Sequence, residues 1–175
     1  MKTIEETSQS PETHTKKVVQ MHMLAKNFAD QLAQKVHKDG LIEFGQVLQY
    51  GKVYFGKEIE NGEFVTIEEY IEGEFVKYIN NNGVILSIQA EDNLTRKAEC
   101  LAHFSYEKST HKLMVLDIQG TDHMLYDPEI ASTEQFDNEE LLFCTGNLSC
   151  NAIEGFIDSH TCNDYCKMLN LKELK

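Results

Sequence analysis

The pattern that most restricts the fold lies near the end of the chain, where a histidine and two cysteines fall within seven residues: His160, Cys162 and Cys166. These are residue types that Zn²⁺ prefers, and cysteines four apart lie on one face of a helix. Structural zinc usually has four protein ligands, so one ligand must come from elsewhere. His103, on an upstream helix, is the best candidate among the other histidines. The alternative is that the cysteines are buried and bind no metal.

The composition limits the class of protein. With 175 residues the chain is long enough for one domain with a substantial core, and we expect one domain rather than two independent ones. Its net charge of −13 disfavours nucleic-acid or anionic-membrane binding, because both require a positive surface. An acidic surface keeps a protein soluble or suits a basic peptide partner.

The chain carries no signal for a membrane or for export. Apolar runs fall short of the roughly 18–20 residues that span a bilayer, and the N-terminus lacks the apolar centre of a signal peptide. We therefore expect a cytoplasmic protein whose cysteines stay reduced. Five cysteines, an odd number, then favour metal binding over disulfides.

The N-terminal part predicts one long helix. Residues 1–15 are polar and aperiodic, which predicts a disordered lead. Residues 16–36 have apolar side chains at spacings of three and four, typical of an amphipathic helix, and Gly40 lies where a helix stop is expected. These apolar positions are Val19, Met23, Ala25, Phe28, Leu32 and Val36.

The middle of the chain changes to strand patterns. Residues 41–71 alternate and are rich in β-formers, with Asn61-Gly62 as a hairpin turn, so we expect an antiparallel sheet. Residues 73–82 are interpreted as a short helix that stops at Asn82-Gly83. A second long helix follows, with Thr95 as its cap.

The last third of the chain mixes both types. Residues 111–118 and 123–127 predict two strands, the second ended by a proline. Residues 128–143 are acidic and are interpreted as a loop with a possible short helix. Residues 151–156 and 163–169 predict two short final helices. The fold class is therefore α+β.

Oxygen-bearing side chains lie at the ends of these two late strands. Asp117 and Gln119 are two apart, so on a strand they would share a face, and Asp127 lies across the turn. Two carboxylates and an amide suit a hard cation such as Mg²⁺. The alternative is that Gln119, Asp122 and Asp127 bond the backbone of the turn.

Several long stretches, taken together and in order, resemble the alpha-kinases, a family of atypical serine/threonine protein kinases. They are MLAKNFADQ, YIEGEFVKYINNNG, LAHFSYEKSTHKLMVLDIQG, Asp127-Pro128, GNL and FIDSHTCNDYCKMLNL, and they extend from Val19 to Leu171. The resemblance implies a two-lobed kinase-like fold with ATP bound between the lobes. Residues 16–71 would be a remnant of the N-terminal lobe, and residues 72–175 the C-terminal lobe.

The resemblance also assigns roles and implies ATP, Mg²⁺ and structural Zn²⁺ as cofactors, with a protein bearing Ser or Thr as substrate. Asp117 matches the catalytic aspartate, and Gln119 and Asp127 match the pair that binds Mg²⁺, which suits a reaction that depends on positioned charge. The family's zinc ligands match His103, His160, Cys162 and Cys166. Its adenine-binding linker matches Glu68, Glu69 and Tyr70, and its glycine-rich loop matches Gly146 and Asn147.

The chain departs from the family pattern at two places. The strand with an ATP-phosphate lysine, which the family has upstream of the first helix, has no counterpart here, and Lys2, Lys16 and Lys17 are no substitute. Cys144 and Ser149 stand where the loop usually has glycine, and a side chain there restricts the backbone. Three functions are therefore compatible with the sequence. The chain is an active kinase, a pseudokinase that serves as a binding or regulatory module, or a zinc-stabilised structural domain without nucleotide.

Overall fold

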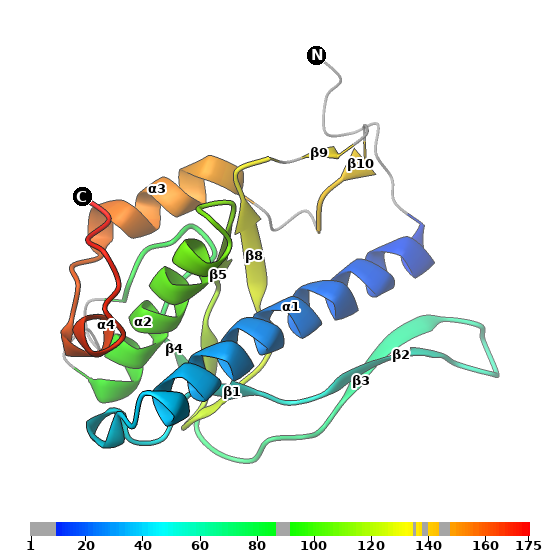
Figure 1. Cartoon of the computed structure of the whole chain (residues 1–175). Helices are drawn as coiled ribbons and strands as arrows, with labels where there is room; N and C mark the ends of the chain where they lie inside the picture. Colours follow the sequence, from blue (N-terminus) through cyan, green and yellow to red (C-terminus); the bar gives the residue numbers. More distant parts are fainter. Residues whose placement is uncertain (1–9, 87–91, 135, 138–139, 144–147) are drawn as a thin grey trace.

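The computed structural model describes residues 10–86, 92–134, 136–137, 140–143 and 148–175 (Figure 1). Three features organise it: a long first helix over a β-hairpin, a small four-stranded sheet, and a second helix packed between a strand pair and the C-terminal helices. No helix in these ranges combines the length and the apolar composition needed to cross a membrane. The helices and strands are α1 (Pro11–Lys38), η2 (Ile42–Phe44), β1 (Gln49–Tyr50), β2 (Val53–Lys57), β3 (Phe64–Glu68), β4 (Val76–Lys77), α2 (Asn93–Lys108), β5 (Leu113–Leu116), β6 (Gln119–Thr121), β7 (Met124–Leu125), β8 (Glu129–Ser132), β9 (Phe136–Asp137), β10 (Glu140–Leu141), α3 (Ser149–Ser159) and α4 (Asp164–Met168).

Helix α1 confirms the first predicted helix but begins earlier. Ser10 caps it by accepting a hydrogen bond from the Thr13 backbone N–H at 3.2 Å, and Pro11 occupies the first turn, where a missing N–H costs nothing. The expected disordered lead is therefore wrong for residues 11–15, while residues 1–9 lie outside the described ranges. The predicted apolar face is confirmed at Ala25, Phe28 and Leu32, which are buried, but not at Met23, which is 61% exposed. Its buried apolar residues are Met21, Ala25, Phe28, Ala29 and Leu32.

Strands β2 and β3 confirm the predicted hairpin. They pair in antiparallel register from Val53 with Glu68 to Lys57 with Phe64, and Gly62 in the connecting loop has φ +75°. Figure 1 shows the hairpin lying along α1. The Lys16 ammonium lies 5.5 Å from the centre of the Phe55 ring, which joins the helix to the hairpin.

The four-stranded sheet has the order β1-β7-β6-β4, with β1 parallel to β7 and the other pairs antiparallel. Strand β4 replaces the short helix expected at residues 73–82, so that prediction is wrong. The segment pairs with β6 instead, Val76 opposite Gly120 and Lys77 opposite Gln119. This pairing places Lys77 beside the predicted Mg²⁺ ligand.

Helix α2 packs against the β5–β8 pair and against α4. Its cap is Asp92 rather than Thr95, whose N–H donates to the Asp92 carboxylate at 3.4 Å. The prediction of a loop at residues 128–143 is wrong for Glu129–Ser132, which form β8; this strand pairs with β5 and is largely buried. The two final helices are confirmed as α3 and α4. Together with α1, these elements enclose one apolar core.

Candidate functional site

Asp117 lies between β5 and β6 in a left-handed conformation, φ 49°. Aspartate tolerates this region better than most residues, and such backbone conformations cluster at functional sites. The predicted strand thus ends before Asp117, and strand alternation is not what relates it to Gln119. Instead its N–H donates to the Asn80 carbonyl at 3.4 Å, and its carboxylate forms an ion pair with the Lys77 ammonium at 2.7 Å. The result is a largely buried carboxylate with a cation beside it.

Gln119 and Asp127 are brought together by the β6–β7 hairpin. The Gln119 side-chain N–H₂ donates to the Asp127 backbone carbonyl at 3.2 Å and lies 3.5 Å from its carboxylate. The alternative interpretation, a bond to turn backbone, is therefore observed for Gln119. It does not compete with a role as ligand, because the amide nitrogen makes this bond and leaves the side-chain oxygen for a cation.

Two further groups respond to the charge of this site. Burial, and then the Asp117 and Asp127 carboxylates, raise the pKa of Glu129 to about 7, and the same causes raise the pKa of Tyr50. The Glu129 Oε2 and the Tyr50 hydroxyl are both buried without a hydrogen-bond partner in the described part of the chain. Concentrated negative charge with unsatisfied oxygens fits a hard cation such as Mg²⁺.

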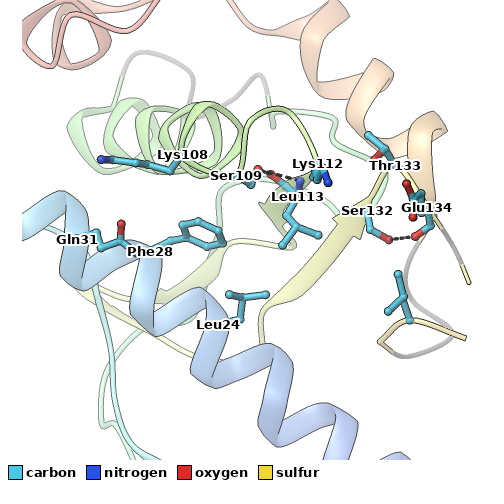
Figure 2. A pocket seen from close by; sticks show the side chains of 11 residues that line it. Leu24, Phe28, Gln31, Lys108, Ser109, Lys112, Leu113, Ser132, Thr133 and Glu134 are labelled. Atoms are coloured by element: carbon cyan, nitrogen blue, oxygen red, sulfur yellow. Dashed lines mark hydrogen bonds between the residues drawn. The ribbon is translucent and has the colours of Figure 1, made fainter. Parts of the chain in front are cut away.

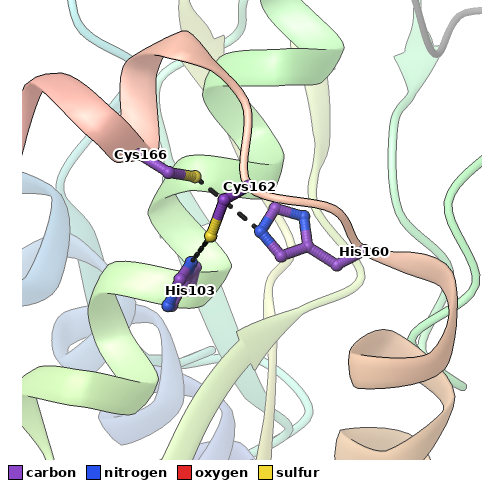
Figure 3. A group of neighbouring side chains, drawn as sticks. All are labelled: His103, His160, Cys162 and Cys166. Atoms are coloured by element: carbon purple, nitrogen blue, oxygen red, sulfur yellow. Dashed lines mark hydrogen bonds between the residues drawn. The ribbon is translucent and has the colours of Figure 1, made fainter. Parts of the chain in front are cut away.

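The second cluster consists of His103 from α2, His160 at the end of α3, Cys162 from the segment between α3 and α4, and Cys166 from α4 (Figure 3). One ligand atom from each lies within 4.8 Å of all the others. The Cys162 sulfur is 3.7 Å from His103 Nδ1, and the Cys166 sulfur is 3.7 Å from His160 Nε2. The structure thus brings together all four residues predicted to bind zinc, and two thiols with two imidazoles are a usual zinc set.

The two cysteines of this cluster differ in acidity. A hydrogen bond from the Cys100 thiol, together with His103 and His160, lowers the pKa of Cys166 to about 3 against the opposing effect of burial. Burial and the neighbouring Cys166 raise the pKa of Cys162 to about 11. Without a metal the cluster thus keeps one thiolate and resists a second, whereas zinc would stabilise both.

The expected adenine linker borders a hollow of about 360 Å³. Its lining includes Tyr126, which directly precedes Asp127, so the linker and the predicted Mg²⁺ ligands lie around neighbouring space. Tyr70, the last residue of the expected linker, is 87% exposed. The lining residues are Glu68, Glu69, Tyr70, Ile71 and Tyr126.

Another hollow, of about 390 Å³, contains none of the predicted site residues (Figure 2). It lies between α1 and the end of α2, with Phe28 and Leu113 among its apolar lining and Lys108 at its rim. The expected glycine-rich loop residues Gly146 and Asn147 lie outside the described residues.

Sequence patterns missed three residues at the first site: Lys77, Glu129 and Tyr50. Lys77 stands in the stretch YIEGEFVKYINNNG, but only the β4–β6 pairing reveals its contact with Asp117. Glu129 follows Asp127 by two residues, so a search for acidic residues near the predicted ligands would have found it. For Tyr50, far upstream, no sequence signal exists.

Comparison with known proteins gives a consistent result. The sequence model of the alpha-kinase family matches residues 1–166. Transient receptor potential cation channel subfamily M member 6 of Homo sapiens is 38% identical over 101 residues, which are 58% of this chain and 5% of that protein. Eukaryotic elongation factor 2 kinase of Mus musculus is 35% identical over 97 residues, 55% of this chain and 12% of that protein.

Solved structures extend the likeness to nearly the whole chain. The alpha-kinase domain of myosin heavy chain kinase A in complex with ADP superposes with a TM-score of 0.77 at 25% identity, covering 93% of this chain and 61% of that one. The chain therefore spans a minor part of the curated relatives, and its fold matches about three-fifths of the solved alpha-kinase domain. With the family model matching nearly its full length, this chain belongs to the alpha-kinase family.

Proposed function

We propose that the chain binds Mg²⁺–ATP and transfers its γ-phosphoryl group to a serine or threonine hydroxyl of a protein substrate. The observation that carries the proposal is the 2.7 Å ion pair between Asp117 and Lys77, because Lys77 on β4 lies opposite Gln119, whose side chain in turn contacts Asp127. Family membership and the nucleotide complex of a related kinase domain support it. The boundary between a part at residues 16–71 and a part at residues 72–175 belongs to the same proposal, with the linker as the nucleotide's border.

In this proposal each residue has a defined role. Asp117 orients the substrate hydroxyl and accepts its proton as the oxygen attacks the γ-phosphorus and the bond to ADP breaks. Lys77 fixes the Asp117 carboxylate and supplies positive charge near the phosphoryl group. The Gln119 amide oxygen and the Asp127 carboxylate would hold Mg²⁺, which neutralises phosphate charge when bound.

The zinc cluster has a separate, structural role in the proposal. His103, His160, Cys162 and Cys166 would hold Zn²⁺ with four protein ligands, which leaves no position open for substrate. The metal would join the C-terminal segment to α2. Its contribution is to folding rather than to phosphoryl transfer.

Thermal unfolding with and without Mg²⁺–ATP tests the nucleotide site. Ligand at about 100 times its Kd stabilises by about 2.7 kcal/mol, which for a chain of this size raises Tm by roughly 5–10 °C. We expect this shift for the wild type and for Glu60→Ala, an exposed carboxylate in the hairpin loop, and its loss in Asp127→Ala.

Phosphate transfer to a basic serine/threonine peptide separates binding from catalysis. Asp117→Asn should keep most of the Tm shift and lose transfer by about 10²-fold or more, the range for a positioned proton acceptor. A wild type that shows no Tm shift although zinc is bound would contradict the kinase proposal and support a binding module without nucleotide.

A further inference from the structure

His160 is held on both sides of its ring. Its Nε2 faces the Cys166 sulfur at 3.7 Å, and its Nδ1 lies 2.8 Å from a carboxylate oxygen of Glu99 on α2. Both side chains are withdrawn from solvent, 1% exposed for His160 and 9% for Glu99. Glu99 thus contacts one of the four predicted ligands without being one of them.

The contact fixes which nitrogen of His160 carries a proton. A carboxylate only accepts hydrogen bonds, so Nδ1 must be the donor. In the neutral imidazole this leaves the lone pair on Nε2, the nitrogen that faces the cysteine sulfur. The bond therefore prepares His160 to bind a metal through Nε2 and limits rotation of its ring.

Within the described part of the chain, His103 Nε2 has no equivalent hydrogen bond. Glu107 lies one turn beyond His103 on α2, but its carboxylate is 3.7 Å from His103 Nε2, too far for a hydrogen bond. The Glu107 carboxylate instead accepts a hydrogen bond from the Lys172 backbone N–H. Glu99 and Glu107 thus stand four residues either side of His103, yet only Glu99 bonds a member of the cluster.

We infer that Glu99 is a positioning residue for the zinc site, which sets the tautomer and the ring orientation of His160. The inference rests on the proposed zinc site. Carboxylates that bond a metal-binding histidine fix its orientation and raise its basicity, and their loss typically lowers metal affinity by about 10–100-fold. Helix α2 therefore contributes a ligand, His103, and also the support of a second ligand 61 residues away in sequence.

The test measures the zinc Kd of the full chain by competition with a chromogenic chelator. Glu99→Ala should weaken zinc binding by about 10–100-fold. Glu99→Gln keeps the volume and a hydrogen-bond acceptor, so it should lose less and should fold even if the alanine variant does not. Glu107→Gln is the matched control on the same helix and should stay within about twofold of the wild type, because its carboxylate does not bond His103.

Nuclear magnetic resonance of ¹⁵N-histidine gives a readout that loss of packing alone would not move. In the zinc-loaded wild type, His160 should carry a slowly exchanging proton on Nδ1 and a metal-bound Nε2, and Glu99→Ala should lose the slow exchange. A wild type that binds no zinc would refute the zinc site itself. A wild type that binds zinc, with Glu99→Ala unchanged or Glu107→Gln equally weakened, would refute only the role of Glu99.

Discussion

Gly120 is the residue at which a single methyl group should disrupt the proposed catalytic site most directly. It lies in β6 next to Gln119, opposite Val76 on β4 and Leu125 on β7. A Cβ placed there would be 2.1 Å from the Met124 carbonyl oxygen and 2.9 Å from the Leu125 Cα. Carbon–oxygen contacts normally begin near about 3.3 Å, so β7 would have to move by roughly 1 Å.

The expected cost follows from what that movement breaks. Overpacking a close-fitted site costs about 1–3 kcal/mol, and weakening a buried hydrogen bond adds about 1 kcal/mol. We therefore expect Gly120→Ala to lower the free energy of unfolding by about 2–4 kcal/mol. Because β7 leads directly to Asp127, the same movement should separate Asp127 from Gln119 and abolish the Tm shift with Mg²⁺–ATP.

Urea denaturation of the zinc-loaded chain measures the stability term. Gly51→Ala is the matched control, because a Cβ at Gly51 meets no atom within 4 Å and the residue is outside the left-handed region. That variant should be neutral or gain up to about 1 kcal/mol from reduced freedom of the unfolded chain. If Gly120→Ala stayed within about 0.5 kcal/mol of Gly51→Ala and kept its response to Mg²⁺–ATP, the close approach of β6 and β7 would be wrong.

Two further predictions concern the zinc cluster and the acidic site. Cys166→Ser should release zinc and lose the stabilisation that bound zinc provides, about 2.7 kcal/mol at 100 times the Kd. The control Cys150→Ser changes an exposed cysteine and should keep both the zinc and the stability. Equal zinc content in the two variants would contradict the zinc site. Glu129 has a pKa raised to about 7 from 4.5, so between these values the folded state binds more protons than the unfolded state and stability falls as pH rises. Because the side chain is partly exposed, screening should reduce this loss to about 1 kcal/mol. Urea denaturation at pH 4.5 and pH 7 should show Glu129→Gln losing less stability than the wild type, and equal losses would refute the assignment.

Short sequence patterns predicted the elements whose structure depends mainly on their own residues. Spacing of three and four predicted α1, and Asn61-Gly62 predicted the β2–β3 hairpin, because both signals arise within a few residues. Even there the boundaries shifted: Ser10 and Pro11 form a start signal that the aperiodic composition of the lead obscured. The buried face was predicted correctly at Ala25, Phe28 and Leu32 but not at Met23, which is exposed.

Long-range pairing decided the segments for which the prediction was wrong. Val76 and Lys77 form a strand because β6 is available to pair with them, although their own sequence suggested a helix. The same applies to β8, whose residues lie in an acidic segment but complete the antiparallel pair with β5. In both cases the partner strand lies far away in sequence, beyond the range of any local signal.

The candidate sites likewise contain residues that local patterns predicted and residues that only the fold reveals. The zinc cluster was predictable because the types and spacing of Cys162, Cys166 and His160 are informative by themselves, and a helix supplied His103. The Lys77–Asp117 and Glu99–His160 contacts were not, because each joins common residue types that lie far apart in the sequence. Charge partners of this kind require the fold before they can be named.

Helix α2 connects the proposed zinc cluster to the proposed phosphoryl-transfer site. One face of the helix carries His103 to the cluster, while the Ser105 hydroxyl accepts a hydrogen bond at 2.9 Å from the Val115 backbone N–H of β5. Strand β5 ends at Leu116, immediately before Asp117. A packed strand therefore links the helix that carries His103 to the residue proposed to accept the substrate proton, although no proposed zinc ligand takes part in the chemistry.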